Sequence, residues 1–378
     1  MIRRTLSDRI KEKIGLGKAI LITGPRQVGK TTLIRQLIAD EDVRFLDGDD
    51  PSIRAQLTYP NTEQIRTLIG NKKVVFVDEA QMVEGIGLTL KIIIDQFKDV
   101  QLWISGSSSF DLYDRTIEPL TGRKWAYQLY PISWEEFEQH VGYLKSEQQI
   151  ERRLVYGFYP EVIKNQGYET EILNELTNSY LYKDVLAYAD IRKPEILDNL
   201  VRALALQIGQ EVNYSELSRL IGLDRNTIIS YIDILEKAYV VFRLRSFGKN
   251  VRTEIRKARK IYFYDNGIRN AIINNFDPLD LRADKGALWE NFLVSERIKQ
   301  REYKLVLARS YFWRTTQQQE IDYIEEKAQK LSAFEFKWNP KKTKPISKTF
   351  TRAYEAQTAT ITRENFRNFV IMEKEQYA

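Results

Sequence analysis

Short apolar runs, each followed by a longer amphipathic stretch, characterise the first 143 residues. The runs are AILIT (19–23), VRFLDG (43–48), VVFVDE (74–79) and QLWISG (101–106). Continuous apolar runs that alternate with helical periodicity are typical of parallel strands covered by helices on both faces. We therefore predict an α/β fold built on a parallel sheet for this part of the chain.

The pattern changes after residue 150. Residues 151–198 show aromatic-rich helical periodicity without a strand-like run, which predicts a helical unit. The segment 213–242 predicts two short helices around the turn IGLD, followed by a β-rich run at 239–247. The apolar positions expected to face inward in this helix pair are Leu217, Leu220, Ile221, Ile228, Ile232 and Leu235.

A mixed α/β pattern returns after residue 260. A helix is predicted at 286–300, and strands are predicted at 311–315, 320–324 and 331–338.

The stretch GPRQVGKTTL lies between the first apolar run and a helical segment, and it fits the spacing G-x-x-x-x-G-K-[ST]. Glycines let backbone amides turn inward around phosphates, and the following helix offers unpaired N–H groups. A lysine here reaches the β and γ phosphates, and the next hydroxyl coordinates Mg²⁺. The residues predicted to bind ATP are Gly24, Pro25, Arg26, Gln27, Val28, Gly29, Lys30, Thr31 and Thr32.

Two further apolar runs end in polar residues. Asp78 ends one run and is expected to hold Mg²⁺ together with Thr31, while Glu79 is expected to polarise the attacking water. The other run continues into Ser105, Ser107 and Ser108, one of which is expected to sense the γ phosphate. Two solvated carboxylates at a strand end are the structural alternative.

With SGSS at 105–108 and PLTGRKWAYQLYPISWEEF at 119–137, these motifs resemble the bacterial and archaeal AAA+-superfamily ATPases that carry a C-terminal domain. The resemblance implies that Ser107 is the phosphate sensor and that Arg123 stabilises the transferring phosphoryl group. It also implies that a helical lid follows YGFYPEV and that ATP is preferred to GTP. A surface arginine is the alternative for Arg123, and its action within one chain or across a ring stays open.

The helix pair suggests a winged helix whose second helix begins after Asp224 and presents Arg225, Asn226 and Ser230 outward. Eight Lys or Arg lie between residues 243 and 260 against one acid, Glu254. Such a basic segment beside a helix-turn-helix favours a DNA partner. Winged helices that dock proteins, with a solvated basic hairpin, are the alternative.

The C-terminal third carries Asp322 on one predicted strand and Glu335 and Lys337 on the next. Residues two apart on a strand share a face, and two carboxylates that hold Mg²⁺ beside a lysine can cleave phosphodiesters. This arrangement, preceded by a helix with Glu290, resembles the PD-(D/E)XK nuclease core. The alternative is a folded platform without cleavage activity.

Composition narrows the function classes. The net charge of +6 is compatible with an acidic partner, and the chain has no cysteine and one histidine, His140, which excludes thiolate and His-cluster metal chemistry. Without an apolar leader or a run of eighteen apolar residues, we expect a cytoplasmic protein that does not contact membranes. Oligomeric state stays open.

The sequence thus predicts a multidomain ATPase that acts as an ATP-controlled switch or motor on DNA. The alternative is a nucleotide-gated protein scaffold with an inactive nuclease-like domain. The expected domains are a P-loop domain at 1–145, a helical lid at 146–198, a winged helix at 199–255 and a restriction-endonuclease-like α/β domain at 256–378.

Overall fold

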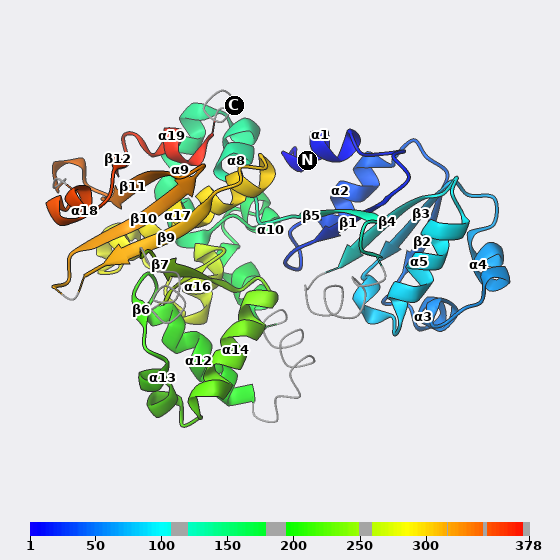
Figure 1. Ribbon diagram of the computed structural model, residues 1–378, viewed down its shortest axis with the longest axis horizontal. Helices are drawn as coiled ribbons and strands as arrows, with labels where there is room; N and C mark the ends of the chain where they lie inside the picture. Colours follow the sequence, from blue (N-terminus) through cyan, green and yellow to red (C-terminus); the bar gives the residue numbers. More distant parts are fainter. Residues whose placement is uncertain (107–119, 179–193, 249–258, 316, 343–345, 373–378) are drawn as a thin grey trace. The chain divides into compact units, whose positions relative to one another are not determined.

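A computed structural model describes residues 1–106, 120–178, 194–248, 259–315, 317–342 and 346–372 (Figure 1). The chain forms two compact units. Unit 1 comprises Met1–Pro131 and Lys237–Tyr239, and unit 2 comprises Ile132–Glu236 and Val240–Ala378.

Within its described residues, unit 1 contains a five-stranded sheet in the order β2-β3-β4-β1-β5, and every pairing is parallel. The strands are β1 (Ala19–Thr23), β2 (Val43–Asp47), β3 (Val74–Asp78), β4 (Gln101–Gly106) and β5 (Lys124–Gln128). The α/β fold with a parallel sheet is therefore confirmed.

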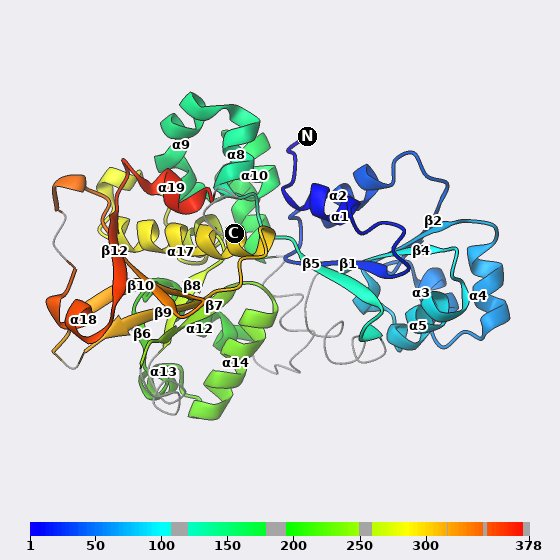
Figure 2. The same ribbon diagram turned by 45° about the horizontal axis from the view of Figure 1, so that its top comes forward.

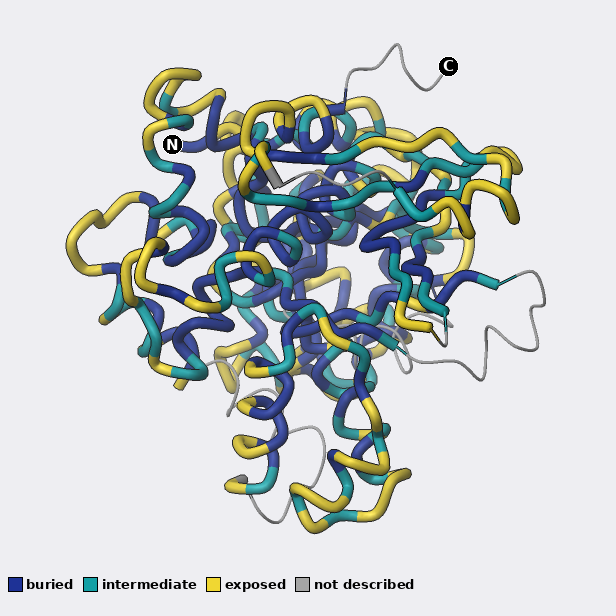
Figure 3. Tube along the Cα trace, turned by 90° about the vertical axis from the view of Figure 1, so that its left-hand side faces the viewer, coloured by how far each residue is buried: buried dark blue, intermediate teal, exposed yellow. Residues whose placement is uncertain are grey.

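Helices cover both faces of this sheet, with α1 and α2 on one face and α3 and α5 on the other (Figure 2). Their bounds are α1 (Leu6–Lys11), α2 (Lys30–Leu37), α3 (Pro51–Leu57), α4 (Thr62–Ile69), η1 (Ala80–Met82) and α5 (Ile86–Gln96). β1 and β3 are buried at every position, as the apolar runs predicted. Figure 3 shows how far each described residue of the chain is buried. Two-sided coverage explains why these runs are continuous instead of alternating.

Unit 2 contains a mixed sheet in the order β12-β11-β10-β9-β7-β8-β6 among the residues described. Its strands are β6 (Glu211–Val212), β7 (Val241–Ser246), β8 (Arg259–Phe263), β9 (Arg309–Arg314), β10 (Glu320–Lys327), β11 (Lys330–Phe336) and β12 (Ala356–Ile361). β7 pairs with β8 on one side and with β9 on the other. Strands from the segments expected as a winged helix and as a nuclease-like domain thus form one continuous sheet, and the expected boundary between them stays a prediction.

The helices of unit 2 pack around this sheet and around one another. Those before β8 are α8 (Trp134–Val141), α9 (Tyr143–Tyr156), α10 (Pro160–Lys164), α12 (Pro194–Leu206), α13 (Tyr214–Ile221) and α14 (Arg225–Lys237). Those after β8 are α16 (Asn266–Ile272), η2 (Leu279–Leu281), α17 (Lys285–Tyr303), η3 (Pro340–Lys342), α18 (Lys348–Ala353) and α19 (Phe366–Val370).

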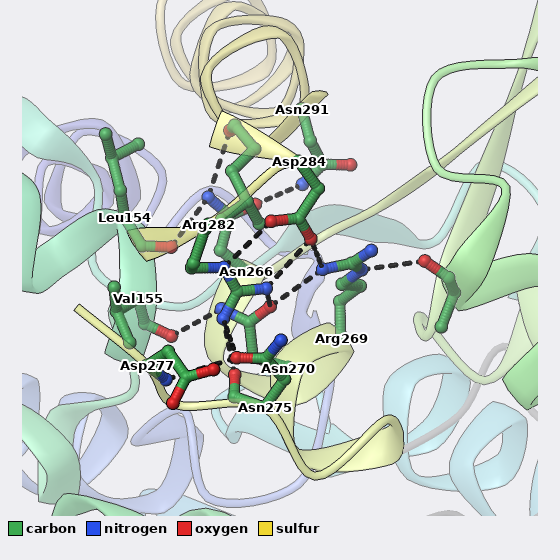
Figure 4. Close-up of polar contacts among 12 residues, drawn as sticks. Leu154, Val155, Asn266, Arg269, Asn270, Asn275, Asp277, Arg282, Asp284 and Asn291 are labelled. Carbon is green, nitrogen blue, oxygen red and sulfur yellow. Dashed lines mark hydrogen bonds and ion pairs between the residues drawn. The ribbon is translucent and has the colours of Figure 1, made fainter. Parts of the chain in front are cut away.

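A buried polar network joins α9, α16 and α17 in unit 2 (Figure 4). Asn266 donates through Nδ2 to the carbonyls of Leu154 and Leu288, at 3.1 and 3.0 Å. Asn270 donates to the Val155 carbonyl at 2.7 Å. Because these amides satisfy carbonyls that water cannot reach, the network fixes how the three helices meet.

No helix in the described part of the chain is both long and apolar enough to cross a lipid bilayer.

Candidate functional site

The loop between β1 and α2 is shaped by residues with positive φ. Gly24, Gln27 and Gly29 have φ values of 147°, 58° and 94°. A Cβ on Gly24 would lie 2.0 Å from the Leu129 carbonyl oxygen, so only glycine fits there. Of the predicted loop, Gly24, Pro25, Val28 and Lys30 are buried, Arg26, Gly29 and Thr31 are half-buried, and Gln27 and Thr32 are exposed.

Lys30 begins α2 and turns back into the loop. Its ammonium donates to the carbonyls of Gly24 and Pro25 at 3.0 and 2.8 Å, and the residue is 4% exposed. The cation therefore lies inside the curve of the loop, where a phosphate group would need its charge.

Thr31, in the first turn of α2, meets Asp78, the last residue of β3. The Thr31 hydroxyl lies 2.9 Å from Asp78 Oδ2 and 3.1 Å from Oδ1. Ser105, at the end of β4, also donates to Asp78 Oδ1 and is fully buried. The sequence analysis offered three serines as the sensor of the γ phosphate. The structure places Ser105 beside Asp78, whereas Ser107 lies outside the described residues.

Glu79 follows Asp78 with a left-handed backbone at φ 45°. Its carboxylate accepts a hydrogen bond from the Gln81 side-chain amide. Gln81, which sequence reasoning missed, thus holds the expected general base in one orientation. A polar residue two positions after the carboxylate was the available signal.

Arg123 does not join this group within the chain. Its carbonyl accepts from Ala19 N at 3.0 Å at the start of β1, and its side chain pairs with Asp95 at 2.7 Å. The phosphate loop follows the other end of β1, about 13 Å away for four residue steps along a strand. The parallel register of β1 and β5 therefore separates Arg123 from the loop in its own chain.

The second candidate cluster lies in unit 2, where the structure brings all four predicted residues close to one another. Lys337 Nζ lies 3.0 Å from Glu335 Oε2 and 3.7 Å from Asp322 Oδ2. Glu290 pairs instead with Lys260, whose Nζ is 2.9 Å from Glu290 Oε1 and 2.5 Å from Glu320 Oε1. Lys260 was grouped by sequence with the basic segment and was missed as part of this cluster.

Burial dominates the electrostatics of the second cluster. It raises the pKa of Glu290 to about 7, although Lys260 opposes the shift. Burial, followed by the nearby Glu335, raises the pKa of Asp322 to about 6. Burial would lower the pKa of Lys260, but Glu290, Glu320 and Asp322 together raise it above its usual range. Lys260 and Lys337 thus remain charged, and they offset part of the negative charge of the cluster.

The residues considered for a DNA partner differ in accessibility. Arg225 is exposed at the start of α14, and Asp224 caps this helix by accepting from Asn226 N and Thr227 N at 2.9 and 3.0 Å. In the described part of the segment 243–260, Arg243 pairs with Glu236 and Asp233, and Lys260 is 2% exposed. Arg252, Arg256 and Lys257 lie outside the described residues.

A parallel sheet with a glycine-shaped loop, a lysine inside the loop and a Thr–Asp pair at the carboxyl edge defines a P-loop nucleotide-binding domain. Residues 16–138 match a family model described as an AAA domain, in agreement with this class. The chain therefore carries an AAA-type, nucleotide-binding ATPase domain. Residues 147–279 and 285–377 match models described as domains of unknown function, DUF8612 and DUF4143.

Relatives match most of this chain at low sequence identity. An uncharacterised protein of Mycobacterium tuberculosis is 27% identical over 343 residues, which cover 89% of this chain and 74% of that protein. An uncharacterised protein of Haemophilus influenzae is 25% identical over 337 residues, covering 82% and 80%.

The solved structures that match this chain have lower sequence identity still. A Walker-type ATPase of Pyrococcus abyssi has 15% identity and a TM-score of 0.48, covering 72% of this chain and 96% of that one. Cdc6p of Pyrobaculum aerophilum has 12% identity and a TM-score of 0.32, covering 73% and 96%.

Proposed function

We propose that the chain is a Mg²⁺-dependent ATPase that works as a nucleotide-controlled switch or motor on DNA. The observation that carries the nucleotide part is the position of the Lys30 ammonium, enclosed by the carbonyls of its own glycine-rich loop. A bound triphosphate would pair with this ammonium in place of the loop carbonyls. The backbone N–H groups of residues 26–32, which include the first turn of α2, would donate to the phosphate oxygens.

The donor set at Asp78 fits Mg²⁺. A hydroxyl and a carboxylate, already 2.9 Å apart in Thr31 and Asp78, are oxygen ligands of the kind that this ion prefers. When bound, Mg²⁺ would offset the charge that develops on the transferring phosphoryl group. Ser105 keeps the Asp78 carboxylate oriented through its hydroxyl.

Glu79 serves as the general base in this proposal. Its carboxylate would accept the proton of the attacking water once the Gln81 amide releases it. Arg123 then contributes to hydrolysis only from a neighbouring copy, since its place at the start of β5 separates it from its own loop.

DNA is the proposed partner through Arg225 and the basic segment 243–260. The exposed Arg225 at the start of α14 suits a phosphate contact. The ion pairs of Arg243 and the burial of Lys260 reduce the cationic surface that the sequence suggested.

That reduction favours a second candidate function, a nucleotide-gated scaffold in which α13 and α14 dock protein and the nuclease-like cluster has no activity. Lys260 and Lys337 already pair with the acids of the cluster. Among the residues described, no three acidic or imidazole side chains are grouped so as to hold a metal ion. In this arrangement Lys260 and Lys337 neutralise carboxylates that a metal ion would need, so DNA cleavage is no part of the proposed function.

Calorimetry with ATP and Mg²⁺ tests the nucleotide part, and saturable binding is the expected result. The ATPase rate with and without duplex DNA at low salt separates the two candidates. Stimulation that falls steeply with added salt supports the DNA switch. If the protein binds ATP but does not bind DNA, and DNA does not change its ATPase rate, the scaffold is the supported function.

A further inference from the structure

Arg4 is a buried arginine that touches the phosphate loop from the N-terminal segment. It is 5% exposed and lies just before α1. Its Nη1 donates to the Val28 carbonyl at 2.7 Å, and its Nη2 donates to the Tyr130 carbonyl at 2.6 Å. One guanidinium thus connects two backbone segments that are about a hundred residues apart in sequence.

The two carbonyls that accept from Arg4 belong to the phosphate loop and to the segment that leaves unit 1. Val28 belongs to the loop that is proposed to hold phosphate, next to Gly29. Tyr130 directly precedes Pro131, the last residue of unit 1 before the chain enters unit 2 at Ile132. Residues 129–131, which we call the exit segment, are therefore linked to the phosphate loop through Arg4.

A second set of contacts joins the same two segments. Leu129 N donates to the Thr23 carbonyl at 2.8 Å. The Leu129 carbonyl is also the group that leaves no room for a Cβ on Gly24. A shift of the phosphate loop cannot leave the exit segment unaffected, because the two are in van der Waals contact as well as hydrogen-bonded.

We propose that Arg4 is a positioning residue that couples the state of the phosphate loop to the connection between the two units. This inference rests on ATP binding at residues 24–32. When Lys30 turns from the carbonyls of Gly24 and Pro25 towards a phosphate, the loop backbone reorganises around it. The rigid, planar guanidinium of Arg4 passes the displacement of the Val28 carbonyl to Tyr130, since both bonds come from one fork.

The absence of native cysteine allows a direct measurement. Cysteines introduced as Glu63→Cys in unit 1 and Leu307→Cys in unit 2 carry a donor and an acceptor dye. Glu63 has a side chain that is 81% exposed, and Leu307 is 88% exposed, so labelling disturbs little packing. Energy transfer is recorded with and without saturating ATP and Mg²⁺.

The test compares Arg4→Met with Arg3→Met in this labelled chain. Arg3 is the matched control, because its side chain is 71% exposed and pairs with the exposed Asp8 at 2.8 Å. We expect the ATP-dependent change in transfer to be lost in Arg4→Met and kept in Arg3→Met. ATP affinity should fall by no more than about tenfold, the net worth of an ordinary hydrogen bond. Arg4→Lys should restore part of the change.

Two outcomes overturn the inference while leaving the nucleotide site intact. One is ATP binding by the native sequence without any change in transfer. The other is a full change in Arg4→Met at saturating ATP, which would give Arg4 a purely structural role. Failure of the native chain to bind ATP would instead reject the proposed function itself.

If Arg4→Met does not fold, hydrogen exchange of the native chain with and without ATP tests the same coupling. In the native chain, ATP should alter the exchange of amides in the peptide 129–132 together with those of 24–32. Unchanged exchange at 129–132, with protection at 24–32, would contradict the coupling.

Discussion

Lys30 is the residue on which nucleotide binding most depends. Lys30→Ala removes the ammonium group that donates to the loop carbonyls of Gly24 and Pro25. We expect ATP binding to fall below detection in calorimetry. Lys73→Ala, an exposed lysine before β3, is the control and should bind as the native chain does. Tight binding by Lys30→Ala would reject the proposed phosphate site.

Glu79 should separate binding from turnover. Glu79→Gln keeps the size of the side chain and removes its basicity, so ATP should still bind while the hydrolysis rate falls by about 100-fold or more. Steady-state phosphate release is the measurement. Equal rates in the native and variant proteins would mean that another group activates the water.

Gly24 is expected to tolerate no side chain. A Cβ would meet the Leu129 carbonyl at 2.0 Å, and the φ of 147° is strained for any other residue. Gly24→Ala should therefore lose ATP binding through distortion of the loop, whereas Gly70→Ala, with open space around the added Cβ, serves as the strained but uncrowded control. Circular dichroism distinguishes local distortion from unfolding.

Spacing predicts local chemistry well and long-range partners poorly. Lys30, Thr31, Asp78 and Glu79 follow from motifs, because each lies at the helix start or the strand end that its own short stretch of sequence predicts. Arg123 could not be placed, because the register of β5 against β1 depends on a pairing across a hundred residues. The pairing of Lys260 with Glu290 could not be predicted either, because β8 and α17 come together only in the folded protein.

At the scale of elements, the capping box of α8 offers a stability test. Ser133 accepts from Glu136 N at 3.2 Å, and Glu136 accepts from Ser133 N at 3.0 Å. Ser133→Ala leaves a helix-end amide unpaired in a buried position, so it should cost about 1 kcal/mol. The urea midpoint should shift accordingly. Ser230→Ala, exposed within α14, is the control and should shift it little.

Periodicity located most elements but not their partners. The helix predicted at 286–300 and the strands predicted at 320–324 and 331–338 coincide with α17, β10 and β11. Leu220 was expected to face inward and is 65% exposed. A short amphipathic helix such as α13 can turn slightly without breaking its pattern, so sequence alone does not fix which apolar residue is covered.

At the scale of the whole molecule, the polar network of unit 2 predicts sensitivity to acid. Burial disfavours ionisation of Asp284, but hydrogen bonds from Arg282 and Arg269 outweigh it and lower its pKa to about 2. A lowered folded-state pKa adds stability above the unfolded value near 4, and that stability is lost as the pH falls from about 4 towards 2. Urea unfolding between pH 7 and 2 measures it.

Asp284→Asn supplies the control for this acid transition. It should be less stable than the native chain at pH 7 and should lose less stability on acidification, because one titrating group is gone. Identical pH profiles for the two proteins would show that other carboxylates dominate.

The shared sheet of unit 2 has a mechanical consequence. β7 follows α14 and pairs with β9, which leads through β10 to the acids at Asp322 and Glu335. A force on α13 and α14 would be transmitted to the acidic cluster through the backbone hydrogen bonds between neighbouring strands. A ligand bound at α13 and α14 would therefore be connected through one sheet to the strands that carry Asp322 and Glu335.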